Sequence, residues 1–128
     1  MGLFDGLKKD SHEKFQCKMD KYLKEAGWNT IIDYLYSPFI TVDIVLFDNE
    51  NRSVGAVAAE PEFNETVAAA HEGFANKMIE EGFIEFFLLI VPDQVYICKG
   101  EGFTKIDTIP TPENYKAVIN GTVNLYLS

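Results

Sequence analysis

Cysteine is scarce in this chain of 128 residues, which contains only Cys17 and Cys98. The two lie far apart in the sequence and form no CxxC pair. A disulfide framework or a cysteine-type zinc site normally shows several such residues at short, regular spacing. We therefore expect two reduced and largely buried thiols, and neither a disulfide nor a cysteine-ligated zinc ion.

Long apolar segments are also lacking. The longest, residues 83–91, contains Glu85 and has about half of the roughly 20 residues that a membrane-spanning helix requires. The N-terminal sequence MGLFDGLKK has no long apolar region of the kind found in signal peptides, and Gly6 stands where a myristoylation signal carries Ser or Thr. We therefore expect a soluble, cytoplasmic protein without membrane attachment.

Positive charge is in short supply. The chain has 20 acidic and 11 basic residues and a formal net charge of -9, which opposes binding to a phosphate backbone. Six lysines and five acids fall within residues 1–26, so the first helix is the one region with a positive balance. Any contact with nucleic acid would therefore have to use Lys14, Lys18 and Lys21 of this helix, and the alternative is a solvated helix face of mixed charge.

The chain does contain enough apolar surface for one packed domain over residues 1–128. Hydrophobic residues make up 47% and aromatic residues 13% of it, without repeats or low-complexity segments. Helical spacing of apolar residues predicts helices, and short runs rich in Ile, Val, Thr, Tyr and Phe predict strands. In chain order these are a helix over 10–26, strands over 29–36, 40–48 and 53–59, a helix over 63–81, strands over 83–91, 94–98 and 103–107, a helix over 112–119 and a last strand over 122–127.

This order predicts an α/β fold with a mixed central sheet flanked by helices and a small C-terminal cap. The strand over 53–59 is rich in small residues, including Gly55, and is expected at the centre of the sheet with a helix packed closely against it. The run over 83–91 is apolar almost throughout, as in a strand that is buried on both faces and pairs in parallel with a neighbour.

Three carboxylates can converge beside this sheet. Alternation of side chains places Asp43 on one face of its strand, and Glu60 and Glu62 on one face of the next. If the two faces coincide, the carboxylates repel one another unless a hard cation lies between them. Such a cluster favours Mg²⁺, which would hold a phosphate and acidify its own bound water.

The stretch VDIVLFDNENRSVGAVAAE, residues 42–60, resembles the strand meander of the PD-(D/E)xK, or restriction-endonuclease-like, superfamily. The resemblance covers about residues 10–100. It implies a core in the order α-β-β-β-α-β, an aspartate early in the second strand and an acid-x-Lys motif in the third. Asp43 matches the aspartate of that pattern.

The acid-x-Lys motif is not matched, and two alignments remain open. Aligned by its hydrophobic run, the third strand has Ala58 in the place of the family's acid and Glu60 in the place of its lysine. Aligned by its carboxylates, it offers Glu60 and Glu62 as metal ligands with Asp43, and Glu25 as an outer ligand. Pro61 favours the first alignment because proline marks the end or edge of a strand.

We therefore predict a nuclease-like core with an eroded catalytic set and no cofactor, which acts by binding a protein partner or by forming a homodimer. The alternative is a Mg²⁺-dependent nuclease whose catalytic residues are Asp43, Glu60 and Glu62, with Asp43 and Glu60 on the metal. In a third reading the meander is an accident of α/β patterning and the chain is only a dimerising module, which strand order would decide.

The sequence also predicts the surroundings of His71 and Asp33 and a surface for dimerisation. His71 lies on the apolar stripe of its helix and is expected to be a core or half-buried histidine with a hydrogen-bond partner. Asp33 is expected to face solvent. The dimer surface would be an exposed sheet edge or the segment TVNLYL, whose residues Val123, Leu125 and Leu127 share one face.

Overall fold

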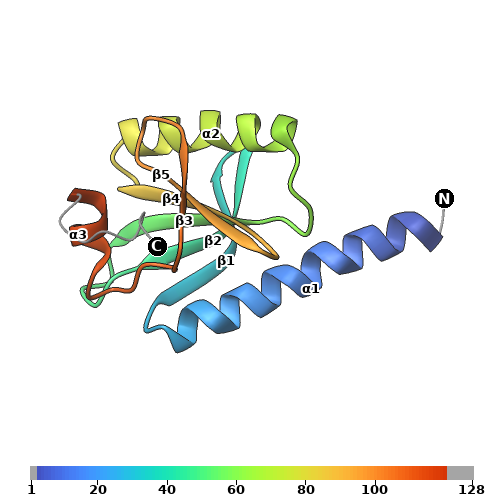
Figure 1. Cartoon of the computed structure of the whole chain (residues 1–128), viewed down its shortest axis with the longest axis horizontal. Helices are drawn as coiled ribbons and strands as arrows, with labels where there is room; N and C mark the ends of the chain where they lie inside the picture. The colour runs from blue at the N-terminus through green and yellow to red at the C-terminus, as the bar shows by residue number, and fades with distance from the viewer. Residues whose placement is uncertain (1–2, 121–128) are drawn as a thin grey trace.

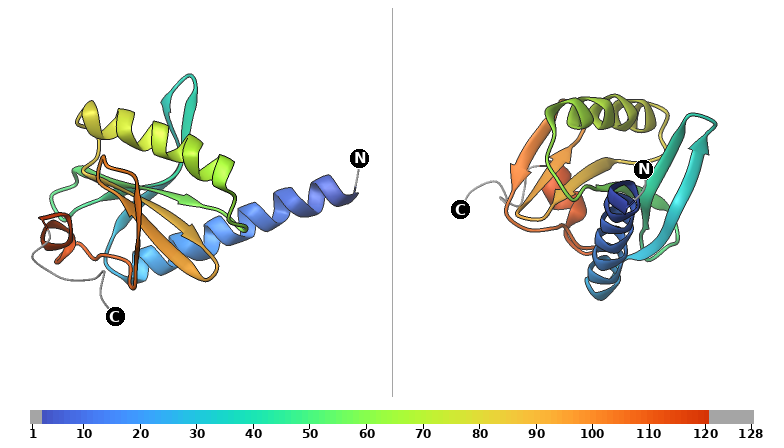
Figure 2. Two further views of the ribbon diagram at one scale, coloured as in Figure 1. Left: turned by 45° about the horizontal axis from the view of Figure 1, so that its top comes forward. Right: turned by 90° about the vertical axis from the view of Figure 1, so that its right-hand side faces the viewer.

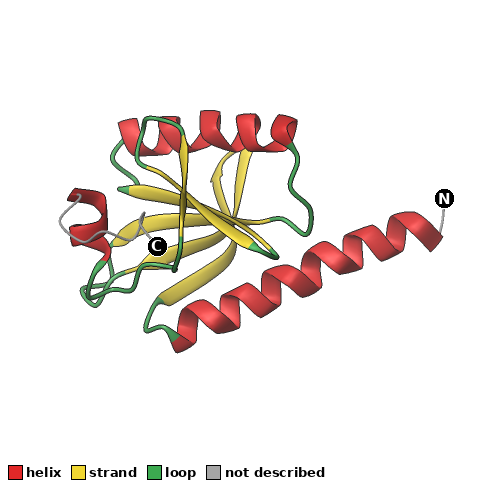
Figure 3. Ribbon diagram, in the orientation of Figure 1, coloured by secondary structure: helices red, strands yellow, loops and turns green. Residues whose placement is uncertain are grey.

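The computed structural model describes residues 3–120, and the side chains of residues 11–120. Within this part of the chain, helices and strands alternate much as the sequence predicts (Figures 1 and 3). The predicted last strand over 122–127, with Val123, Leu125 and Leu127, lies outside the described residues. In order the elements are α1 (Leu3–Glu25), β1 (Asn29–Ser37), β2 (Ile40–Phe47), β3 (Ser53–Ala59), α2 (Glu65–Glu80), β4 (Phe86–Val91), β5 (Gln94–Cys98), β6 (Phe103–Ile106) and α3 (Tyr115–Asn120).

The strands form one open sheet in the order β1-β2-β3-β4-β5-β6. All neighbours pair antiparallel except β3 and β4, which are parallel and are joined through α2. Parallel pairing and complete burial of β4 are what its uninterrupted apolar run predicts. The α/β class with a mixed sheet is therefore confirmed, and β3 lies inside the sheet as expected.

The two long helices cover opposite faces of the sheet (Figure 2). On the α1 face, Leu23 packs with residues of the central strands and with α3, including Phe86 and Tyr115. On the α2 face, Ala75 and Met78 pack against Ala56 and Ala58 of β3 and their neighbours. The sheet thus buries both faces, which explains why β3 and β4 carry no charged residue.

Each of the three helices begins at a different residue from the predicted one, and each ends within one residue of its predicted end. The predicted start of α1 at residue 10 rests on a capping box of Asp10 and Glu13, but the helix already begins at Leu3, because Gly6 inside a helix costs only about 1 kcal/mol and does not stop it. α2 begins after Asn64, whose side chain accepts hydrogen bonds from two backbone N–H groups of the first turn. α3 begins at Tyr115, after a turn that starts at Thr111. Within residues 3–120, no helix has both the length and the apolar character that a membrane crossing requires.

The reason for the small residues of β3 is partly different from the predicted one. A Cβ atom added to Gly55 would lie 2.6 Å from the Phe86 ring of β4 and 3.1 Å from Leu46 of β2. Gly55 therefore makes room for side chains of its neighbouring strands on the α1 face. Ala56 and Ala58 make room for α2, as predicted.

The thiols are free, as expected, but only one is buried. Cys98 is buried on β5, whereas Cys17 is exposed on the solvent side of α1. The expectation for Cys17 is therefore wrong. It stands one residue after Gln16, which faces the sheet, so the helical rotation turns it outward.

Candidate functional site

Asp43 occupies the point where β2 and β3 separate. The last pair of the ladder on this side is Ile44 with Val57, so the next position along the two strands brings Asp43 to Ala58. Beyond it, the β1–β2 hairpin projects past α2 (Figure 2). The backbone N–H of Ala59 donates to a side-chain oxygen of β2 here, Asp43 Oδ2, at 3.0 Å. This hydrogen bond holds the carboxylate of Asp43 against the end of β3, at the point where the two strands separate.

Glu60 is the first residue after β3 and turns toward α2. Its backbone N–H donates to the carbonyl of Ile90 on β4, which holds the chain in line with the sheet for one more residue. Its Oε2 lies 2.9 Å from Nε2 of His71, on α2. Both side chains are about four-fifths buried, at 22% exposed for Glu60 and 19% for His71. The prediction that His71 is half-buried with a hydrogen-bond partner is therefore confirmed.

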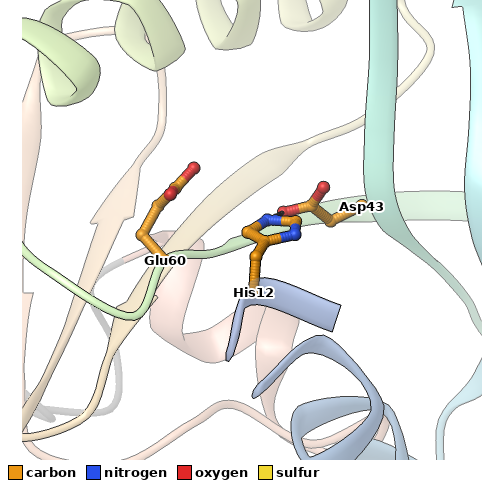
Figure 4. A group of neighbouring side chains, drawn as sticks. All are labelled: His12, Asp43 and Glu60. Carbon is orange, nitrogen blue, oxygen red and sulfur yellow. Dashed lines mark ion pairs between the residues drawn. The ribbon is translucent and has the colours of Figure 1, made fainter. Parts of the chain in front are cut away.

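His12 of α1 completes the group (Figure 4). Its Nε2 lies 3.5 Å from Asp43 Oδ2, and one nitrogen of His12 and one oxygen each of Asp43 and Glu60 lie within 4.8 Å of one another. One turn further along α1, the buried Gln16 donates to Asp33 Oδ1 at 3.0 Å and to the backbone carbonyl of Asp43 at 3.3 Å. These hydrogen bonds hold α1 against the start of β2.

His12 is not among the site residues that the sequence predicts. A signal was nevertheless present, because His12 precedes Met19 by seven residues and Leu23 by eleven, on the apolar stripe of its helix. The position of His12 on this stripe predicts that its side chain turns toward the sheet. It does not predict that two carboxylates lie at the strand ends beside it.

The predicted site residues are only partly brought together. Asp43 and Glu60 converge, as the alternation of strand residues predicts. Glu62 is exposed beyond Pro61 and lies beside the β4–β5 turn in a separate hollow. Glu25 is exposed at the end of α1, about 20 Å along the helix from His12. The alignment that uses Glu62 and Glu25 as ligands therefore does not fit, because Pro61 ends the strand before Glu62.

The group has a defined charge pattern. Burial raises the pKa of Asp43, and the negative charge of Glu60 acts in the same direction. The hydrogen bond from Ala59 and the neighbouring His12 and His71 act against this rise in the pKa of Asp43. Among the described side chains of residues 11–120, the bases paired with these two carboxylates are histidines, and no lysine or arginine forms an ion pair with either.

Little space adjoins the group. A cavity of about 20 Å³ is lined by Asp43, Ala58 and His71 together with apolar residues such as Phe74 and Met78. A volume of this size holds about one water molecule. The arrangement can therefore exchange protons between histidines and carboxylates or hold an ion, and the cavity beside Asp43 and His71 is too small for a large substrate.

The Mg²⁺ that the family resemblance implies fits this group poorly. Mg²⁺ favours six oxygen ligands in a near-octahedral arrangement and keeps several waters. Here one of the three candidate ligands, His12, contributes nitrogen instead of oxygen. In the alignment by the hydrophobic run, Glu60 stands in the place of the lysine that the resemblance implies, so that alignment supplies no lysine to steady a phosphate there.

Comparisons of this chain with protein-family models, with curated proteins and with solved structures gave no match. The three lysines predicted as the nucleic-acid contact, Lys14, Lys18 and Lys21, are all exposed on α1. Their exposure is compatible with either a polyanion contact or a solvated helix face, and that prediction stands as made.

Proposed function

We propose that this chain is a non-nucleolytic member of the restriction-endonuclease-like group that acts by associating with a second copy of itself. The order of its first elements, with α2 connecting β3 to an adjacent parallel β4, supports the kinship. So does the position of Asp43 early in β2. Strand β4 would not need to lie beside the meander if the pattern of residues 42–60 were an accident of α/β sequences.

The observation that supports the proposed loss of nuclease activity is that Ala58, and not an acid, follows Val57 at the position in register with Asp43, where the two strands separate. The register of β2 and β3 favours the alignment in which alanine takes the place of the family's acid and Glu60 that of its lysine. Loss of one preorganised electrostatic group costs about 3 kcal/mol of transition-state stabilisation. In this alignment the acid and the lysine are both replaced, so too little transition-state stabilisation remains for the hydrolysis of a phosphodiester.

The proposed association surface is the edge of β1 with its hairpin, to which no other strand of residues 3–120 pairs. Strand β1 has nine residues, contains neither lysine nor proline, and is an outer strand of the sheet. Lysine and proline are common devices that keep edge strands from pairing with other chains. Leu35 is 67% exposed and Phe39, in the hairpin turn, is 89% exposed. An outer strand with large exposed apolar side chains favours pairing with another strand.

A second copy is the occupant that best fits this edge. The backbone at Asp33 has a φ of 52°, which interrupts the extended conformation in the middle of β1. The residues of β1 beyond it, 35–37, therefore form the segment available for pairing, which ends before Pro38 of the hairpin turn. It carries no charge, so two copies can meet there antiparallel about a two-fold axis despite the net charge of -9.

Association is tested by light scattering after size-exclusion chromatography. The wild-type chain is expected to elute as a dimer at about 100 µM, and Leu35→Lys as a monomer because it places a charge in the apolar contact. Thr66→Lys, an equal change of charge on the exposed side of α2, is the matched control and should remain dimeric. A monomeric wild-type chain, or a dimeric Leu35→Lys variant, would contradict the proposed surface.

One observation favours the alternative of a Mg²⁺-dependent nuclease using Asp43, Glu60 and Glu62, namely the convergence of the first two. The test is cleavage of single- and double-stranded DNA and RNA with Mg²⁺ or Mn²⁺. We expect equal background rates for the wild type and for Asp43→Ala. Cleavage by the wild type that disappears in Asp43→Ala would establish the nuclease and refute the eroded site.

A further inference from the structure

We propose that His12, Asp43 and Glu60 form a binding site for a divalent transition-metal ion of the zinc class, and that His71 is a positioning residue for Glu60. The inference does not depend on association through β1. The proposed ion differs from the magnesium that the family resemblance implies, because the ligand set differs from that of a magnesium site.

The distances suit a small, tightly coordinated ion. Zinc lies about 2.0–2.1 Å from nitrogen and oxygen ligands, so neighbouring ligand atoms of a tetrahedral site are about 3.3 Å apart. His12 Nε2 and Asp43 Oδ2 already lie 3.5 Å apart. The widest separation in the group is 4.8 Å or less, which a rotation of the Glu60 side chain can shorten. Three protein ligands leave a fourth position for water.

The chemistry of the ligands selects among metals. A set of one imidazole nitrogen and two carboxylate oxygens suits zinc and its neighbours, whereas magnesium and calcium favour oxygen alone. A bound dication also removes the repulsion between the carboxylates of Asp43 and Glu60. Both carboxylates are mostly buried, at 18% and 22% exposed, so an ion there would interact with them at low dielectric.

Hydrogen bonds outside the ligand set hold two of the ligands in place. His71 binds Oε2 of Glu60 and leaves Oε1 for an ion, and the N–H of Ala59 holds Asp43 at Oδ2. Carboxylate ligands of metals are commonly held by such partners, and their removal typically weakens metal affinity 10- to 100-fold. His71 therefore acts on the ion only through Glu60.

The site would join separate parts of the fold. Its ligands come from α1, from β2 and from the segment after β3 (Figure 4). An ion bound to all three fixes the helix to the end of the sheet, so binding raises the melting temperature by mass action. This readout is independent of any enzymatic activity.

The experiment is calorimetric titration of the tag-free chain with ZnSO₄, MnCl₂ and MgCl₂. We expect one Zn²⁺ per chain with micromolar or tighter affinity and no binding of Mg²⁺ at a few millimolar. His12→Ala and Asp43→Asn should weaken Zn²⁺ binding at least 100-fold, and His71→Ala 10- to 100-fold. Circular dichroism of each variant without metal establishes that it is folded, and Asp43→Asn keeps the side-chain volume in case His12→Ala does not fold.

Two controls separate this site from adventitious binding. Glu62→Ala removes a nearby acid outside the group, and Cys17→Ser removes an exposed thiol on the same helix. Neither should change the Zn²⁺ affinity. The chain has only two histidines, both in this group, so Zn²⁺ should shift the imidazole NMR signals of His12 directly and those of His71 less. Absence of Zn²⁺ binding, Zn²⁺ binding that survives in His12→Ala and Asp43→Asn or depends on Cys17, or equal affinity for Mg²⁺ would overturn the proposal.

Discussion

Replacement of Gly55 by alanine tests how tightly the strands around the candidate site are packed. The new Cβ would lie 2.6 Å from Cζ and 2.9 Å from Cε2 of Phe86, and 3.1 Å from Leu46. Ordinary carbon contacts are about 3.5–4.0 Å, so the overlap with the ring is about 1 Å. Phe86 is fully buried, and its ring lies 6.1 Å from that of Trp28 and 5.8 Å from that of Tyr115. The ring cannot move aside without displacing these neighbours.

Overpacking of this kind costs about 1–3 kcal/mol, and with a nearly immobile ring we expect about 2 kcal/mol or more. For a chain of this size the loss corresponds to a fall in melting temperature of roughly 5–10 °C. Guanidinium titration followed by far-UV circular dichroism measures the free energy of unfolding, and a thermal scan measures the melting temperature. The slope of the titration should stay unchanged, because the same surface is exposed on unfolding.

Gly73→Ala is the matched control. It makes the same change in α2, where nothing lies within 4 Å of the added Cβ, and should stabilise the chain by up to about 1 kcal/mol through helix propensity. A smaller ring neighbour should relieve the strain, so Gly55→Ala should cost less in a Phe86→Leu background than alone. If Gly55→Ala changes stability by less than about 0.5 kcal/mol and shows no coupling to Phe86, the close packing of β3 and β4 is refuted.

Three further predictions concern single side chains. Asp48→Asn should destabilise the chain at neutral pH: the backbone N–H of Arg52, with further bonds from its guanidinium and from Glu50, holds the pKa of Asp48 below its ordinary 3.8. The ionised side chain therefore contributes fully to the free energy of unfolding above pH 3.8, and this contribution is lost as the pH falls through the folded-state pKa. Denaturant titrations should show a smaller difference in unfolding free energy between wild type and Asp48→Asn at pH 3 than at pH 7. Asn64→Ala removes the cap of α2 and should cost about 1 kcal/mol, whereas an unchanged unfolding free energy would show that the cap is dispensable. Tyr115→Phe should be neutral or stabilising by up to about 1 kcal/mol, because among the described residues the buried hydroxyl has no hydrogen-bond partner, and a clear loss of stability would contradict this.

The residues of the candidate site differ in how far the sequence predicts them. Asp43 and Glu60 were predictable as a pair because the side-chain period of a strand is two, which places each on a known face. His71 was predictable as half-buried because the period of a helix fixes its stripe. The place of Glu62 was less certain, since it depends on where the chain leaves the sheet, and Pro61 is the local sign that it does so before Glu62.

His12 shows the limit of what local sequence patterns can predict. It lies 31 residues before Asp43 in the sequence, and no spacing rule connects them. Their contact requires that β2 and β3 separate after Ile44 and Val57, and that α1 crosses the sheet beside the gap with Gln16 bonded to the backbone of Asp43. The same holds for Gly55, because strand order decides which side chain fills the space beside it.

The sequence by itself determined the order of helices and strands, the burial of β3 and β4 and the face on which the two carboxylates lie, because these follow from backbone periods that act over a few residues. Only the tertiary structure decided that a histidine of the first helix meets those carboxylates, that Glu62 stays outside, and that β1 is an outer strand of the described sheet. Those outcomes depend on the sheet order, the separation of the strands and the packing of α1, which arise from contacts between residues far apart in the chain.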